Sequence, residues 1–196
     1  MITGNGATRS ILLAGVGGQG ILRASDILAN VFMETGLDVK KSEVHGMAQR
    51  GGCVTSHVRY GRKVFSPLAL KSDVDILLAF EKVETLRYLD YLKTGGSVII
   101  NDQEILPPSV NLGDLAYPSD IAGTVKTLFP ATKIVRAEDL ARKAGNVRTV
   151  NTVLLGVLSA FLTEIGISIW EGVLENSFPA KLMKVNLDAF HLGRTA

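Results

Sequence analysis

The feature that most constrains the fold is a glycine loop near the start of the chain. The six residues GVGGQG, at positions 15–20, follow the apolar run SILLA and precede the amphipathic stretch ILRASDILANVF. The apolar run predicts a buried strand over residues 10–15. In the stretch that follows, apolar side chains recur at helical spacing, which predicts a helix from Ile21 to Phe32. A strand, a glycine turn and a helix form the first half of a βαβ unit, so we expect an α/β fold.

The middle of the chain alternates between strand and helix patterns, with one interruption. Gly36 is placed to end the first helix, and DVKKSEV at 38–44 can return as a second strand. The segments CVTSHVRY (53–60) and KVF (63–65) flank a turn that contains Gly61, which predicts an antiparallel hairpin. The alternation then resumes with a strand over 73–80, a helix over 81–93 ended by two glycines, and a strand over 97–101. This pattern predicts a three-layer, Rossmann-like sheet that is mostly parallel and includes an antiparallel hairpin.

The second half of the chain is predicted to be mainly helical. Residues 103–131 contain four prolines, so this segment is expected to be a long connection with one short helix over 120–129. The segment KIVRA is the last candidate strand. Further helices are expected over 137–144, 150–162, 168–178 and 179–191. Because the sequence has neither an internal repeat nor a low-complexity linker, we expect a single domain over residues 1–196 with a helical C-terminal section.

Composition excludes several classes of function. Apolar residues make up 46% of the chain and charged residues 20%, which is typical of a folded domain. The net charge is only +2 and the basic residues are scattered, so nucleic-acid binding is not expected. The apolar runs are far shorter than the ~20 residues that cross a bilayer. The single cysteine, Cys53, allows no internal disulfide, which favours the cytoplasm, and one thiol cannot hold an iron–sulfur cluster, which needs about four.

The glycine loop has two possible roles. Gly15, Gly17 and Gly20 match the pattern G-x-G-x-x-G, which places a phosphate at a helix N-terminus in dinucleotide-binding proteins. The same glycines also allow a strand to pack closely against the helix that follows it. A dinucleotide site further needs a ribose-binding acid about 20 residues on. The nearest candidate, Glu43, is late and follows two lysines, so we favour a structural or partner-facing turn.

Three side chains around residues 45–57 suggest a metal site, but only weakly. Cys53 and His57 have the same parity on a strand and point to one face, with His45 nearby. No consistent fourth ligand is evident, so no metal is predicted. We expect His57 to be a hydrogen-bonded histidine at a sheet surface.

Two polar or aromatic positions in the C-terminal half also have alternative roles. Asn151 starts an otherwise apolar helix, where it can cap the helix or present its amide to the glycine loop, and capping is favoured. Trp170 and Phe178 are eight residues apart, which is a core-like spacing on a helix. We expect both to be packing residues.

A second loop completes a resemblance to a known family. The segment SEVHGMAQRGGCVTSHVRYG (42–61), together with GVGGQGI, LRYLDYLKTGGSVIIND and VNTVLLG, resembles the gamma subunit or gamma domain of the 2-oxoacid:ferredoxin oxidoreductases. Within that family it is most similar to the smaller, beta subunit of the indolepyruvate type. The resemblance runs from about Ile11 to the end of the chain, including the tail NLDAFHLG.

The resemblance implies a subunit that works inside a larger enzyme. Such enzymes oxidatively decarboxylate a 2-oxoacid, here an arylpyruvate such as indolepyruvate, join the acyl group to coenzyme A and pass two electrons to ferredoxin. The large partner subunit carries thiamine diphosphate with Mg and the [4Fe–4S] clusters. This chain would bind none of them by itself, would be inactive alone, and would work in the cytoplasm as part of a hetero-oligomer, for which a dimer of the heterodimer is one arrangement.

The resemblance also implies a site at the two loops. The segment 45–52 would face the partner near its cofactor, with Arg50 steadying a carboxylate or a coenzyme A phosphate and Gln49 hydrogen-bonding beside it. The alternative is that Arg50 pairs with an acid of this chain and Gln49 caps a turn. The cofactor-binding or partner-facing residues would be Gly15, Gly17, Gly18, Gln19, Gly20, His45 and Asn151.

Two other functions remain open at this point. One is a free-standing nucleotide-binding protein that uses the glycine loop for NAD(P) or FAD. The other is a purely structural interaction subunit without ligand contacts. Thermal stabilisation by a nucleotide would identify the first, and loop substitutions that affect only assembly would identify the second.

Overall fold

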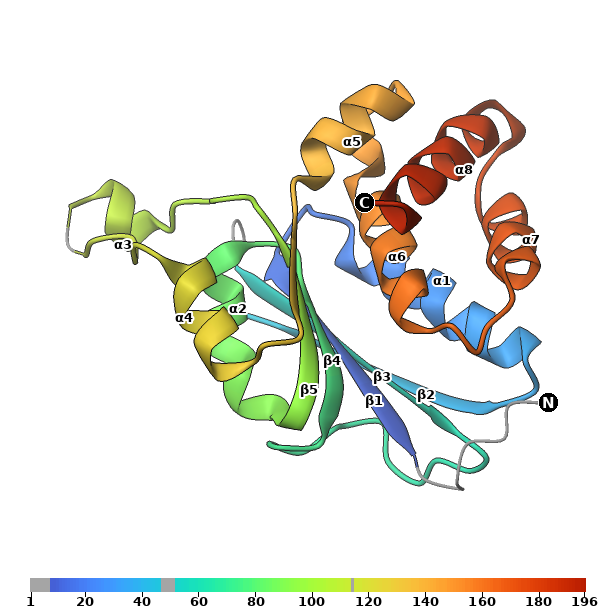
Figure 1. The fold of residues 1–196 in the computed structure, drawn as a ribbon, viewed down its shortest axis with the longest axis horizontal. Coiled ribbons are helices and arrows are strands. Elements are labelled where there is room, and N and C mark those ends of the chain that lie inside the picture. Colours follow the sequence, from blue (N-terminus) through green and yellow to red (C-terminus); the bar gives the residue numbers. More distant parts are fainter. Residues whose placement is uncertain (1–7, 47–51, 114) are drawn as a thin grey trace.

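The computed structural model describes residues 8–46, 52–113 and 115–196. In this part of the chain, six strands form one sheet with the order β2-β3-β1-β4-β5-β6 (Figure 1). The strands are β1 (Arg9–Val16), β2 (Asp38–His45), β3 (Cys53–Gly61), β4 (Val74–Ala79), β5 (Leu92–Asn101) and β6 (Thr132–Val135). Strands β1, β4, β5 and β6 are parallel to one another, and β3 is antiparallel to both β1 and β2. The predicted α/β class, with a mostly parallel sheet and an antiparallel element, is confirmed.

The antiparallel hairpin was predicted in the wrong place. Residues 63–65 are not a strand, and β3 pairs instead with β2, from Asp38 opposite Gly61 to His45 opposite Val54. The other edge of β3 pairs with β1 over eight residues. A short turn pattern favours a local partner for a strand. Here β3 obtains two long ladders by lying between β1 and β2, which the segment Lys63–Phe65 could not provide.

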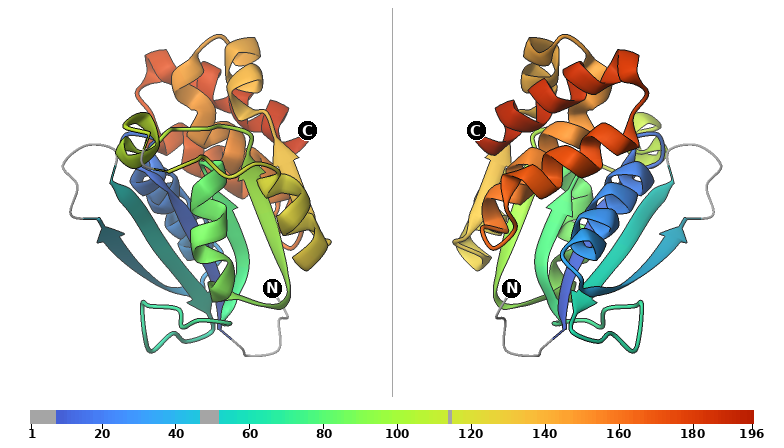
Figure 2. Two further views of the ribbon diagram at one scale, coloured as in Figure 1. Left: turned by 90° about the vertical axis from the view of Figure 1, so that its left-hand side faces the viewer. Right: turned by 90° about the vertical axis from the view of Figure 1, so that its right-hand side faces the viewer.

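Helices cover both faces of the sheet and make three layers. Helix α1 (Ile21–Glu34) and the C-terminal helices lie on one face, and α2 (Lys82–Tyr88) and α4 (Ile121–Leu128) lie on the other. Figure 2 looks onto both faces, with α2 and α4 in front in one view and α1 and α7 (Ile167–Ser177) in front in the other. Successive residues of β1 alternate between the two apolar cores, Leu12 packing toward α4 and Leu13 toward α1. This is the alternation expected of a strand buried on both faces.

The second predicted helix is shorter than its pattern suggested. It ends at Tyr88, a 3-10 turn covers Leu89–Tyr91, and β5 already begins at Leu92, which is buried. Gly95 has a φ of 77° and lies within β5, where the register against β4 shifts. The glycine pair therefore accommodates an irregularity in a strand and does not end a helix. Leu86, Leu89 and Leu92 have the spacing of one helix face, but only Leu92 is buried, and it belongs to the strand.

The C-terminal helices closely follow the predicted ranges. They are α5 (Ala137–Ala144), α6 (Val150–Phe161), α7 and α8 (Ala180–Arg194). The backbones of α6 and α8 are in contact where the two helices cross. A Cβ on Gly156 would lie 2.1 Å from the carbonyl oxygen of Phe190, and a Cβ on Gly193 would lie 2.0 Å from the carbonyl oxygen of Val153. Both glycines are therefore needed for this packing. Trp170 is fully buried as predicted, and Phe178 is half-buried just beyond α7.

The long connection between β5 and β6 contains α3 (Pro108–Asn111) as well as the expected α4, so it has two short helices where one was predicted. None of the helices within the described ranges combines the length and the apolar character that a membrane span requires.

Candidate functional site

The glycine loop connects the carboxyl end of β1 to the start of α1. Gly20 has a φ of 78°, and it accepts at its carbonyl the first helical hydrogen bond, from the amide of Ala24 at 3.0 Å. A Cβ on Gly15 would lie 2.6 Å from Gln19 Oε1 and 2.7 Å from Phe80 Cβ. Close packing at Gly15 and a left-handed backbone at Gly20 are thus sufficient reasons for these two glycines.

The side chain of Gln19 occupies the space inside this loop. Its Oε1 accepts a hydrogen bond from the amide of Val16 at 2.7 Å, and its Nε2 donates to the carbonyl oxygen of Phe80 at 2.9 Å and to Gln103 Oε1 at 3.0 Å. Asn101 Nδ2 donates to the same carbonyl at 3.0 Å and to the same Oε1 at 3.1 Å. We call Gln19, Asn101 and Gln103 the carboxamide cluster. It joins the ends of β1, β4 and β5, and it provides a hydrogen-bond partner for the amide of Val16.

Asn151 is not the N-cap residue of its helix, contrary to the favoured prediction, although its Oδ1 accepts a hydrogen bond from the first-turn amide of Thr152 at 2.9 Å; its Nδ2 lies against the glycine loop. The N-cap of α6 is Thr149, which makes no side-chain capping bond, while Asn146 caps the preceding 3-10 turn by accepting from the amide of Arg148 at 3.0 Å. Asn151 Nδ2 donates weakly to the carbonyl of Gly20 at 3.5 Å, and a Cβ on Gly20 would lie 2.8 Å from that nitrogen. A 3-10 turn precedes α6, so the capping position is at Asn146, before that turn, and not at Asn151.

The sheet order separates the glycine loop from its candidate ribose acid. In a dinucleotide-binding fold the second strand lies beside the first, but here β3 lies between β1 and β2. Glu43 is on β2 and pairs with Lys41 Nζ at 2.6 Å, which in turn also contacts Asp26 on α1. The desolvation of Lys41 is outweighed by these two carboxylates, so its pKa is raised. Together with Gln19, this arrangement argues against a dinucleotide at the loop.

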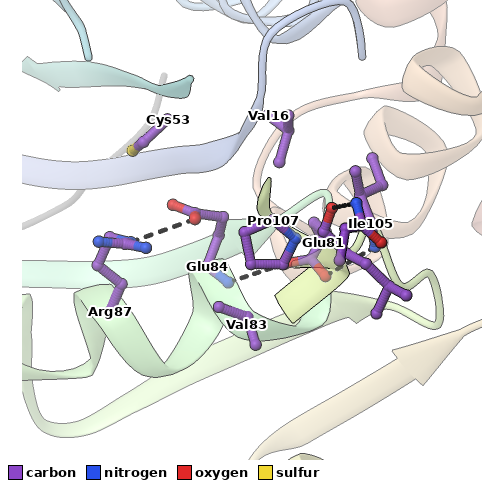
Figure 3. A pocket seen from close by; sticks show the side chains of 10 residues that line it. Val16, Cys53, Glu81, Val83, Glu84, Arg87, Ile105 and Pro107 are labelled. Atoms are coloured by element: carbon purple, nitrogen blue, oxygen red, sulfur yellow. Dashed lines mark hydrogen bonds and ion pairs between the residues drawn. The ribbon is translucent and has the colours of Figure 1, made fainter. Parts of the chain in front are cut away.

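A cavity of about 410 Å³ opens beside the loop, at the carboxyl ends of β1 and β4 (Figure 3). The helices that follow these two adjacent strands, α1 after β1 and α2 after β4, lie on opposite faces of the sheet. In open α/β sheets, ligands bind at the carboxyl ends of two such strands. The apolar wall of the cavity consists of Val16, Val83, Ile105, Leu106 and Pro107. Its polar lining consists of Cys53, Glu81, Glu84, Arg87 and Asn111.

The carboxylate of Glu81 is fully engaged within the fold. It is buried and accepts from the amide of Glu84 at 3.0 Å, the amide of Ile105 at 3.1 Å and the hydroxyl of Tyr117 at 2.6 Å. Burial and this carboxylate raise the pKa of Tyr117. Glu81 therefore caps α2 and fixes the segment that forms the far wall of the cavity.

The carboxylate of Glu84 is only partly engaged. Arg87 Nε lies 3.2 Å from its Oε1, whereas Oε2 is shielded from solvent and has no hydrogen-bond partner among the described residues. Across the cavity, Cys53 Sγ lies 2.8 Å from the Tyr88 hydroxyl. Burial, together with the neighbouring Glu84 carboxylate, raises the pKa of Cys53 to about 11, so the thiol stays protonated at neutral pH.

The histidine predictions have mixed outcomes. His57 Nδ1 accepts a hydrogen bond from the amide of Ala69 at 3.3 Å, which confirms a hydrogen-bonded role. It is buried, however, because residues 62–73 cover this face of β3, and burial lowers its pKa. His45 is exposed at the end of β2. Within the described ranges, no three His, Cys, Asp or Glu side chains are grouped so that they could hold a metal ion.

The second predicted loop lies partly outside the described residues, and so do Gln49 and Arg50. Its two described flanks are anchored beside the glycine loop, since the amide of Gly46 donates to Cys53 at 2.7 Å and the amide of Gly17 donates to Gly52 at 2.9 Å. The described flank at Gly52 therefore lies beside the glycine loop.

Sequence reasoning missed the polar side chains that shape this edge: Glu81, Glu84, Arg87, Asn101 and Gln103. A signal existed for some of them, because Glu81 stands three residues before Glu84 at a helix start, a spacing typical of capping. Burial of Glu84 had no sequence signal.

The sequence of this chain is similar to those of known proteins. Residues 10–196 match the family "Pyruvate ferredoxin/flavodoxin oxidoreductase". The chain is 39% identical to the indolepyruvate oxidoreductase subunit IorB of Archaeoglobus fulgidus, over 94% of this chain and 92% of that one. It is 40% identical to the IorB subunit of Pyrococcus horikoshii, over 94% and 93% of the two chains.

Solved structures show the same fold at lower identity. The gamma subunit of a keto/oxoacid ferredoxin oxidoreductase from Geobacter sulfurreducens superposes with a TM-score of 0.72 at 21% identity, covering 95% of this chain and 94% of that one. A 2-oxoglutarate:ferredoxin oxidoreductase from Magnetococcus marinus superposes with a TM-score of 0.71 at 22% identity, covering 96% of this chain but 30% of that longer one. The strand order, the helical layers and the match over almost the whole sequence lead to one conclusion: this chain belongs to the pyruvate ferredoxin/flavodoxin oxidoreductase family.

Proposed function

We propose that this chain is the small subunit of an indolepyruvate-type 2-oxoacid:ferredoxin oxidoreductase. The complex would oxidatively decarboxylate an arylpyruvate, transfer the acyl group to coenzyme A and pass two electrons to ferredoxin. The observation that carries the proposal is 39–40% identity, over more than nine-tenths of both chains, to subunits that bear the name indolepyruvate oxidoreductase. The same relatives favour this role over a free-standing nucleotide-binding protein.

The cofactors belong to the partner in this proposal. A cluster needs about four thiolates, whereas this chain has one cysteine whose thiol stays protonated, so its residues do not fit a [4Fe–4S] group. The thiamine diphosphate with its Mg and the clusters would be held by the large subunit, and ferredoxin would bind through the complex. Coenzyme A would enter as a co-substrate, and the complex would work in the cytoplasm.

The partner would meet this chain at the carboxyl edge of the sheet. The residues concerned are the glycine loop with Gly15, Gly17, Gly18, Gln19 and Gly20, the exposed His45, the loop contact Asn151, and Gln49 with Arg50. Support comes from the hydrogen bond that holds Gly52, a described flank of the second loop, beside Gly17 of the glycine loop, and from the exposure of His45. We further propose that the chain acts as one domain, and that two heterodimers can associate.

Co-expression tests this proposal. A tag on this chain, expressed with the large thiamine- and iron–sulfur-binding subunit of the same organism, should retain that subunit in a stoichiometric complex through gel filtration. Isolated protein should show no thermal stabilisation by NAD(P) or FAD. Failure of the two subunits to associate would refute the proposal, and so would tight binding of a dinucleotide to the solitary chain.

A further inference from the structure

The cavity beside Glu84 contains a buried carboxylate that the described fold does not fully satisfy. Glu84 is 5% exposed, and its Oε2 is shielded from solvent without a hydrogen-bond partner among the described residues. Buried carboxylates are normally paired and hydrogen-bonded at both oxygens. Glu81, three residues earlier in the same lining, shows the usual state, with three donors. The Oε2 atom of Glu84 therefore lacks a strong donor among the described residues.

The neighbours of Glu84 within the described residues do not supply that donor. Arg87 lies on Oε1 through its Nε, and its side chain is 55% exposed. Cys53, which faces the carboxylate in Figure 3, contributes only a weak S–H donor to Glu84 and also lies against the Tyr88 hydroxyl. The remaining wall is mostly apolar, so water gains little by entering. Among the described residues, no other side chain supplies the missing donor.

The charge of the lining selects the kind of donor. Two carboxylates and one guanidinium line the cavity, so its balance is negative and a phosphate group is disfavoured here. A cation on an aliphatic stem suits both the carboxylate and the apolar wall, because lysine and arginine bury their methylene groups on apolar surface. The group that fits is therefore a basic side chain.

The surroundings of the cavity indicate a protein as the source. Leu106 lines the cavity and is 45% exposed, and Leu112 and Leu115, on the same connection, are 77% and 64% exposed. Apolar residues that exclude water around a buried charged contact are typical of the energetic centre of a protein interface. The cavity also adjoins Val16, at the start of the edge proposed to meet the partner.

We infer that this cavity receives a lysine or arginine side chain of the large partner subunit, which pairs with Glu84 and is covered by Leu106. The inference rests on the proposed function, because it assigns an anchor within that subunit interface. Glu84 stabilises the assembled complex at the expense of the isolated chain, since its carboxylate is incompletely paired until the partner binds.

The test measures the dissociation constant of the two-subunit complex for wild type and for single variants of this chain. Glu84→Gln keeps the shape but removes the charge, and we expect it to weaken assembly at least tenfold. Leu106→Ser, on the rim, should weaken it at least threefold. Glu175→Gln is the control, because Glu175 is exposed on α7, on the opposite face of the sheet, and should leave the affinity unchanged.

The melting temperature of each isolated variant distinguishes an anchor from a structural role. An anchor predicts that Glu84→Gln leaves the melting temperature unchanged or raises it while affinity falls. Equal affinity for Glu84→Gln and wild type would overturn the inference while the proposed function stands, and so would weaker assembly accompanied by a lower melting temperature. If agmatine stabilised wild type but not Glu84→Gln, and complex affinity were unchanged, the cavity would belong to a free amine and the inference would also fail. Lack of any complex with the wild-type chain would instead refute the proposed function.

Discussion

The carboxamide oxygen of Gln19 accepts a hydrogen bond from the backbone amide of Val16 at 2.7 Å, so a side chain of the glycine loop closes the loop. The other end of the same carboxamide ties the loop to Phe80 and Gln103. The loop matches a phosphate-binding pattern, but its glycines serve packing and its glutamine hydrogen-bonds within the protein.

Replacing this glutamine should destabilise the fold. Gln19→Ala removes three hydrogen bonds and leaves the Val16 amide and part of the carboxamide cluster without partners, which should lower the free energy of unfolding by about 2 kcal/mol or more. Urea denaturation followed by circular dichroism measures the change. Glu175→Ala, on the exposed face of α7, is the control and should differ from wild type by less than about 0.5 kcal/mol. A wild-type-like midpoint for Gln19→Ala would show that the cluster contributes little.

The crossing of α6 and α8 should not tolerate a single added methyl group. Gly156→Ala or Gly193→Ala places a Cβ within about 2 Å of a backbone oxygen, so the helices must separate, at a cost of roughly 1–3 kcal/mol or more. Gly172→Ala provides a matched control, because nothing lies within 4 Å of a Cβ at this helical position. That variant should be neutral or more stable by up to about 1 kcal/mol. Equal stabilities of the three variants would contradict the close crossing.

Buried His57 should make the fold less stable in mild acid. Burial, and to a lesser degree the Arg59 charge, lowers its pKa below the ordinary value of 6.5. The unfolded chain therefore binds more protons as the pH drops below about 7, so the contribution of His57 is fully present above that pH and is lost as the pH falls through 6.5 toward the folded-state pKa. Urea midpoints measured from pH 7.5 to 5.0 should decrease for wild type.

His57→Gln is the control for this pH dependence. Glutamine can still accept a hydrogen bond from the Ala69 amide but does not titrate. The urea midpoints of the variant should therefore fall less steeply over the same pH range. The other two histidines are present in both proteins and cancel in the comparison. Identical slopes would exclude His57 as the source.

The lone thiol should be slow to react although it lines a cavity. With a pKa of about 11, only about a thousandth of Cys53 is thiolate at pH 8. Alkylation by iodoacetamide in the folded protein should therefore be about a hundredfold slower than that of a free cysteine, whose pKa is about 8.5. The same chain in 6 M guanidinium should react at the free rate. Fast labelling of the folded chain would mean that the thiol is ionised.

The elements predicted correctly from sequence are those whose signals are local. The strand before the glycine loop, helix α1 and the C-terminal helices follow from apolar periodicity, and Gly36, with a φ of 78°, ends α1 as expected. The partner of β3 could not be predicted in this way, because long-range pairing with β1 and β2 determines it. The spacing of Leu86, Leu89 and Leu92 fits a helix, but Leu92 gains more from the sheet.

The candidate site was predictable only in outline. The resemblance suggested site residues in the two loops, whereas the cavity depends on Glu84 from α2 and on Ile105 and Leu106 from the β5–β6 connection. Burial of a glutamate leaves no pattern in one sequence, since exposed helix starts carry the same residue. Asn151 shows the same limit, because a helix-start asparagine predicts a cap, and only the fold brings it to Gly20.

The most direct test of the account is dye reduction driven by indolepyruvate and coenzyme A, measured for each purified subunit and for the assembled pair. The account predicts turnover only when this chain and the thiamine-containing subunit are together, and none from this chain alone. Reduction of the dye by the solitary chain would contradict it, and so would full activity of the large subunit without this chain.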